Sequence, residues 1–153
     1  MVEPKVTAPG HGEAIQAASN RALIKVAEGD GVGCSVVEYF VAPHFVAPPV
    51  PHANTKEDQV IYVLDGEVLF EFGDRGETIV AGATLTIPRG VKFVWRNERD
   101  EPARLLMIFT PAGFEGYFRD VAAVLASLPT GAPPDPASYM PRITGLWSEY
   151  GIE

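Results

Sequence analysis

The stretch VIYVLDGEVLFEF, residues 60–72, decides the fold class. It consists of two apolar runs rich in β-branched and aromatic residues, which flank Asp65-Gly66. An Asp-Gly pair between such runs is a strong signal of a β-hairpin turn. Further short runs of this kind, separated by turn residues, occupy positions 22–27, 34–41, 77–80, 83–87, 92–96 and 104–110. Short strands at regular spacing predict an all-β sandwich or barrel.

The hydrophobic period changes after Thr110. A helical spacing joins Phe114, Phe118, Val121 and Leu125, which predicts a helix that packs on the barrel. Residues 129–141 are rich in proline and predict a connection without regular structure. A last short helix is expected to hold Trp147 and Tyr150, as residues that dock the tail, and to end at Gly151.

The chain is thereby divided into a lead-in over 1–20, a β-barrel over 21–111 and a C-terminal helical extension over 112–153. A length of 153 residues suits one domain. Twelve Lys and Arg against 20 Asp and Glu give a net charge of −8, which argues against binding to nucleic acid or to a membrane surface. The single cysteine rules out an internal disulfide. The N-terminal residues lack the apolar core of a signal peptide, so we expect a cytoplasmic protein.

Two segments carry a resemblance to a known superfamily. PPVPHANTKEDQVIYVLDGE, residues 48–67, resembles the first cupin motif, G-x5-H-x-H-x3-4-E-x6-G, and GATLTIPRGVKFVWRN, residues 82–97, resembles the second, G-x5-P-x-G-x2-H-x3-N. Over residues 8–153 the chain is similar to small single-domain cupins of the quercetin-dioxygenase-like group. The resemblance implies a cupin fold, which is a double-stranded β-helix or jelly-roll barrel, with a C-terminal helical arm.

The resemblance also locates the metal positions of the family. In metal-binding cupins the two motifs supply three histidines and a glutamate, and the matching positions here are His52, Asn54, Gln59 and Phe93. Transition metals prefer imidazole, thiolate or carboxylate ligands, so we interpret this set as a degenerate metal site and expect no metal and no other cofactor. A rearranged site that uses His44 or Glu57 stays an alternative. For His44, Glu57 and Asp58 a solvated loop is the preferred interpretation.

Strand alternation extends the site from these positions. If Gln59 faces inward, so do Ile61 and Val63, and if Phe93 faces inward, so does Trp95. On the last strand either Met107 and Phe109 or their neighbours Leu106 and Ile108 face inward. The substrate-binding candidates are Ile61, Phe93, Trp95, Met107 and Phe109. The catalytic candidates are His52, Asn54 and Gln59. The result is an aromatic and apolar pocket with a small polar cluster, unless Phe93 and Trp95 fill the barrel completely.

Three functions follow from such a pocket. The preferred one is a metal-independent isomerase, cyclase or lyase that acts on a flat aromatic or polyketide-like substrate. His52 would act as general acid or base, and Asn54 and Gln59 would orient a carbonyl or stabilise an oxyanion. The alternatives are a cupin that binds a small organic molecule without catalysis and a metal-dependent quercetinase-like dioxygenase. An exposed barrel face and a long arm favour a homodimer.

Overall fold

The computed structural model describes residues 3–47, 50–130 and 135–153. Its strands are β1 Glu13–Ala17, β2 Asn20–Val26, β3 Ser35–Val41, β4 Asp58–Asp65, β5 Glu67–Phe72, β6 Arg75–Val80, β7 Thr84–Ile87, β8 Val94–Arg96 and β9 Ala103–Thr110. Its helices are a short 3-10 turn, Glu28–Asp30, followed by α1 Glu115–Ala126, α2 Pro136–Gly145 and α3 Trp147–Tyr150.

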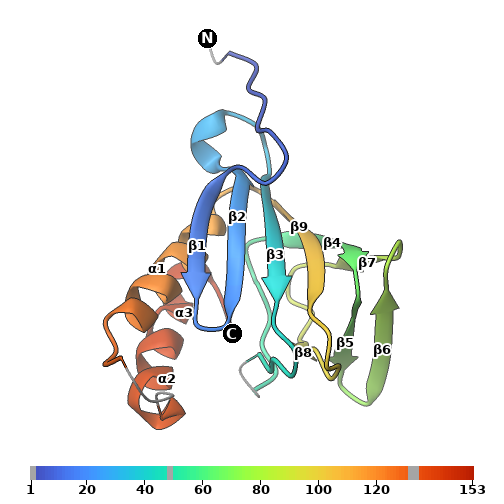
Figure 1. Cartoon of the computed structure of the whole chain (residues 1–153), viewed down its shortest axis with the longest axis vertical. Helices are drawn as coiled ribbons and strands as arrows, with labels where there is room; N and C mark the ends of the chain where they lie inside the picture. The colour runs from blue at the N-terminus through green and yellow to red at the C-terminus, as the bar shows by residue number, and fades with distance from the viewer. Residues whose placement is uncertain (1–2, 48–49, 131–134) are drawn as a thin grey trace.

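The strands form two antiparallel sheets, as the sequence predicted for an all-β fold (Figure 1). The larger sheet has the order β1-β2-β3-β9-β4-β7, and the smaller one has the order β6-β5-β8. Buried side chains from both sheets meet in one hydrophobic core, which includes Val37, Ile61 and Leu105 from the larger sheet and Phe70 from the smaller one. The described residues therefore form a two-sheet double-stranded β-helix rather than a closed barrel.

The Asp65-Gly66 turn has a different role from the predicted hairpin. β4 pairs with β7 and β9, whereas β5 pairs with β6 and β8, so the turn passes the chain from one sheet to the other. Gly66 has a φ of 75°, and a Cβ at this position would lie 2.8 Å from the carbonyl oxygen of Pro102. Glycine is needed because it accepts this backbone conformation and this close approach. The two-residue hairpin lies one strand later, where Phe72 pairs with Arg75.

The first 20 residues contain a strand that the sequence analysis did not predict. β1 pairs with β2 and extends the larger sheet at its edge. Ile15 is the one buried side chain of β1, so this strand carries too weak an apolar pattern to stand out from a lead-in.

The helical extension packs beside β1, where Arg119 of α1 and Glu13 of β1 form a 2.8 Å ion pair (Figure 1). The start of α1 is fixed by the buried carboxylate of Glu115, which accepts hydrogen bonds from the backbone N–H groups of Glu28 and Gly113 and from the hydroxyl of Ser35. These bonds connect the helix to β3 and to the turn before it. Among the described residues no helix is long and apolar enough to cross a membrane.

The expected connection over 129–141 is wrong in its second half, because α2 begins at Pro136. Residues 131–134 lie outside the described residues. Asp135 caps the helix by accepting a 3.1 Å bond from the N–H of Ala137, and proline is well suited to the first turn of a helix, where its missing N–H has no partner to lose. The last helix, α3, ends at Gly151 as predicted, where the glycine has a φ of 66°.

Candidate functional site

A cavity of about 470 Å³ lies between the two sheets and the helical extension. All eight residues that the sequence analysis selected line it: His52, Asn54, Gln59, Ile61, Phe93, Trp95, Met107 and Phe109. On β9 the inward side chains are Met107 and Phe109, which are buried, whereas Leu106 and Ile108 lie on the other face and are partly exposed. The volume falls in the usual range of small-molecule sites.

His52 is held at the rim of the cavity by the backbone of Phe93. The two residues exchange backbone hydrogen bonds of 2.9 and 3.1 Å, and their rings lie 4.8 Å apart. The Nδ1 atom of His52 lies 3.2 Å from the carbonyl oxygen of Val50. A carbonyl oxygen only accepts, so Nδ1 carries the proton and Nε2 is left as the basic atom. Burial lowers the pKa of His52 below its usual 6.5, so the imidazole is neutral at pH 7.

Asn54 and Gln59 complete the polar cluster that the sequence predicted. Asn54 is buried, and its Nδ2 atom makes no hydrogen bond of normal length in the described part of the chain, but the amide is near enough to the Glu57 carboxyl to oppose the rise in the pKa of that group. The backbone of Asn54 is fixed, because its carbonyl accepts a 2.8 Å bond from the N–H of Gly90 and its position pairs with Ile152 at the C-terminus. Gln59 lies on β4 opposite Phe109 of β9, and is also buried. The Asn54 amide thus has the Glu57 carboxyl as one neighbour, and because Asn54 also lines the cavity it can donate to an acceptor on a ligand.

Phe93 and Trp95 form walls and leave the cavity open. The indole of Trp95 stacks on Phe70 with ring centroids 5.7 Å apart, and it meets Tyr39 edge to face at 6.0 Å. Phe93 packs against Phe70 at 5.9 Å. These contacts hold both side chains against the smaller sheet, so the alternative in which they fill the interior does not apply.

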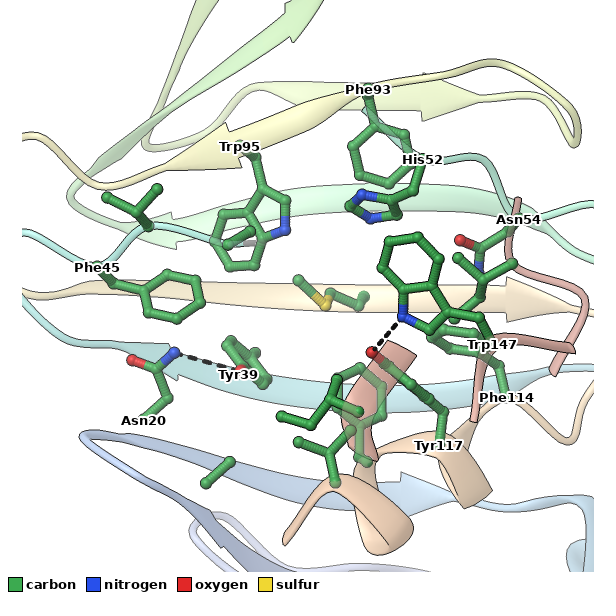
Figure 2. Close-up of a pocket in the computed structure, with 18 of the residues that line it drawn as sticks. Asn20, Tyr39, Phe45, His52, Asn54, Phe93, Trp95, Phe114, Tyr117 and Trp147 are labelled. Carbon is green, nitrogen blue, oxygen red and sulfur yellow. Dashed lines mark hydrogen bonds between the residues drawn. The ribbon is translucent and has the colours of Figure 1, made fainter. Parts of the chain in front are cut away.

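The helical extension supplies residues that the sequence analysis missed. Tyr117 of α1 and Trp147 of α3 both line the cavity, and the Nε1–H of Trp147 donates a 3.3 Å bond to the hydroxyl of Tyr117 (Figure 2). The indole of Trp147 lies 5.5 Å from the His52 ring. Trp147 was expected only to dock the tail, and it also forms a wall. Helical periodicity showed an apolar stripe on α1 but gave no signal of what that stripe would face.

Two further missed residues, Asn20 and Tyr39, line the cavity from β2 and β3. Tyr39 lies on the internal face of β3, together with Val37 and Val41. Val36 and Phe40 on the opposite face of that strand are also apolar. Without alternation between apolar and polar residues, the sequence could not show which face of β3 is internal.

Of the three residues expected in a solvated loop, Glu57 is not solvated, and Asp58 is not in a loop because it is the first residue of β4. His44 is exposed and pairs with Asp100 at 2.7 Å, and Asp58 is half-exposed and pairs with Arg89 at 2.8 Å. Glu57 is only 6% exposed, its Oε2 atom lacks a partner in the described residues, and burial raises its pKa. The C-terminus pairs with the chain shortly before Glu57, where Ala53 and Glu153 exchange two backbone hydrogen bonds. Across the described ranges, no group of three or more His, Cys, Asp or Glu is placed to hold a metal ion.

Residues 37–109 match the family model described as a cupin domain. This segment, which is a little under half of the chain, is a cupin domain. No curated protein is significantly similar to it in sequence.

Solved cupin-like structures share the fold at low sequence identity. KdgF from Halomonas sp. has a TM-score of 0.62 and 14% identity, over 74% of this chain and 99% of that one. An RmlC-like cupin from Shewanella frigidimarina has a TM-score of 0.60 and 17% identity, over 76% and 99%. The polyketide cyclase RemF from Streptomyces resistomycificus has a TM-score of 0.53 and 23% identity, over 69% and 72%. At such identities the likeness shows the fold alone.

Proposed function

We propose that this cupin binds a flat, uncharged aromatic or polyketide-like ketone in its cavity and catalyses proton transfer at the carbon beside the carbonyl, as an isomerase or cyclase does. The observation that carries the proposal is that a neutral imidazole, His52, and a buried amide donor, Asn54, line one aromatic cavity. A base and an oxyanion donor are the two groups that enolisation requires.

The groups in the cavity can account for every proton and electron pair of the proposed reaction. Nε2 of His52 removes a proton from the carbon next to the carbonyl, and the electron pair of the broken C–H bond forms the enolate. The Nδ2–H of Asn54 donates to the enolate oxygen, and the imidazolium then returns the proton to the same or another carbon. Aromatic side chains such as Trp95 and Trp147 supply flat surfaces on which the substrate can stack.

A metal-dependent dioxygenase is a poorer match to the donor set. At the four cupin metal positions, one imidazole stands beside two carboxamides and the phenyl ring of Phe93, and catalytic metals need about three good protein ligands. Elemental analysis of protein purified without added metal tests this point. A stoichiometric Fe, Mn, Ni or Zn signal would overturn the metal-independent proposal.

The test of the proposal uses 2-acetylnaphthalene, a flat and uncharged aryl ketone. Both tryptophans of the chain line the cavity, so quenching of intrinsic fluorescence reports binding. Nuclear magnetic resonance in D2O then follows deuterium exchange into the acetyl methyl group. We expect catalysed exchange that falls roughly a hundredfold or more in His52→Ala. His44→Ala is the matched control, because His44 is exposed and lies outside the cavity lining, and it should leave exchange unchanged.

Binding without exchange would favour the alternative of a non-catalytic small-molecule carrier. Exchange that survives His52→Ala, in protein that melts at the wild-type temperature, would remove His52 from the mechanism. Failure of the probe to quench either tryptophan would refute the assignment of the cavity as the ligand site.

A further inference from the structure

The cavity holds polar groups at two separate places along the strands. Gln59 lies opposite Phe109 of β9, whereas Tyr39 lies opposite Leu105 of the same strand. Four residues of β-strand separate these two positions, which corresponds to about 13 Å. Apolar side chains, among them Met107, line the space between them. Asn20 and Tyr39 lie across the cavity from Asn54, as Figure 2 shows.

The hydrogen bonds of Asn20 define what Tyr39 can do. The backbone N–H of Ala42 donates to Oδ1 of Asn20 at 2.8 Å, so the Nδ2 atom of Asn20 is the one that faces Tyr39. Nδ2 donates to the Tyr39 hydroxyl at 3.3 Å, and the hydroxyl therefore acts as acceptor in this bond. Within the described residues the Tyr39 O–H donates to no other group. Asn20 is 1% exposed and Tyr39 is 7% exposed, and both line the cavity, so an acceptor for this O–H has to come from within the cavity.

The charge of the lining restricts the ligand further. No Lys, Arg, Asp or Glu lines the cavity among the described residues. An anion or cation in this space would lose its hydration without gaining an opposite charge, which is strongly unfavourable. Burial raises the pKa of Tyr39 to about 12, so its hydroxyl stays protonated and keeps its proton to donate.

We propose that Tyr39, oriented by Asn20, forms a second subsite that donates a hydrogen bond to an acceptor oxygen at the far end of the ligand. The inference rests on the proposed function and names its substrate class: an uncharged, flat molecule with a ketone at the His52 end and a carbonyl or ether oxygen at the opposite end. The side chains at the two subsites extend into the cavity, so the gap between their polar atoms is shorter than the backbone separation. A molecule of two fused rings with an oxygen at each end can bridge that gap.

Three probes test this inference by fluorescence titration: 2-acetylnaphthalene, 6-methoxy-2-acetylnaphthalene and the anion 6-methoxy-2-naphthoate. We expect the methoxy ketone to bind about three- to tenfold more tightly than the parent ketone, as one added hydrogen bond permits. We expect the anion to bind at least about a hundredfold more weakly, because the lining offers it no cation.

The variant Tyr39→Phe removes only the hydroxyl. It should abolish the gain from the methoxy group, which is measured as the ratio of the affinities of the variant for the two ketones. Tyr62→Phe is the matched control, because Tyr62 faces outward on β4 and is 38% exposed, and it should preserve the gain. A purely structural role of Tyr39 would weaken both ketones equally.

These measurements distinguish a failure of the second subsite from a failure of the proposed function. If 2-acetylnaphthalene binds and exchanges deuterium but the methoxy group brings no gain, the second subsite is refuted and the proposed function stands. If the naphthoate binds as tightly as the ketones, the inference of an uncharged ligand is overturned. If no probe binds, the proposed function itself fails.

Discussion

Replacing Glu57 with glutamine should raise the free energy of unfolding at neutral pH. Glu57 is buried beside the polar cluster, and its Oε2 atom has no partner among the described residues. Burial raises its pKa above the usual 4.5, which means that the fold disfavours the charged form. Glutamine has nearly the same shape and no charge, so the variant Glu57→Gln imitates the protonated side chain.

The size of the gain follows from the surroundings of the carboxylate. A buried polar group without a partner costs about 1 to 3 kcal/mol, and the charge of Lys56, a hydrogen bond from Asn54 and the charge of Arg89 offset part of that penalty. We therefore expect Glu57→Gln to gain about 1 to 2 kcal/mol at pH 7. For a domain of this size that gain corresponds to a Tm about 2 to 8 °C higher.

The penalty that the Glu57 carboxylate imposes on stability increases as the pH rises. Because the folded-state pKa of Glu57 lies above its unfolded value, the penalty is absent below about pH 4.5 and grows as the pH rises through the folded-state pKa. Carboxylates with a lowered pKa behave in the opposite way. Hydrogen bonds from Arg89 lower the pKa of Asp58 to about 2, and this contribution to stability is lost only as the pH falls. The informative quantity is therefore the difference between variant and wild type.

Urea unfolding of both proteins at a series of pH values between about 4 and 8 measures this difference. Glu3→Gln is the control, because it removes a carboxylate of the same kind from an exposed position. It should change the free energy of unfolding little at any pH. A lower stability of Glu57→Gln at pH 7, or an advantage that persists undiminished at pH 4, would refute the reasoning.

Two further predictions concern the imidazole and the turn between the sheets. Because burial lowers the pKa of His52 below 6.5, deuterium exchange into 2-acetylnaphthalene should rise with pH and reach half of its maximum below pH 6.5; a half-maximum above pH 6.5 would contradict this. Gly66→Ala should lower the free energy of unfolding by about 1 to 3 kcal/mol, because its Cβ would meet the carbonyl of Pro102 at a positive φ. Gly73→Ala has a positive φ with no neighbour within 4 Å, so thermal melting should show a smaller loss for it; equal losses would exclude the close contact as the cause.

Much of the fold could be predicted from sequence because its signals are local. Alternation along β4 placed Gln59, Ile61 and Val63 on one inward face, and the structure confirms that pattern. The Asp65-Gly66 signal correctly marked a change of direction. It could not show that the chain would change sheets there, because pairing partners are a property of the whole topology.

The part of the site that the sequence missed depends on contacts between distant segments. Trp147 reaches His52 because residues 151–153 pair with residues 53–55, about a hundred positions earlier in the chain. Glu57 is also buried, although its charge and its position before a strand both predicted exposure. Neither outcome leaves a periodic pattern, so only the folded structure could show that the helical extension closes the cavity.

Two hydrogen-bond donors in the cavity connect these observations to binding. The Nδ2–H of Asn54 and the O–H of Tyr39 belong to separate segments of the chain, and both residues line the cavity. A ligand with an acceptor oxygen at each end can use both donors, whereas a ligand with one oxygen leaves the second donor to water. Because such a ligand binds only the folded state, it raises Tm as its concentration rises. The two donors therefore select a ligand by the spacing of its oxygens.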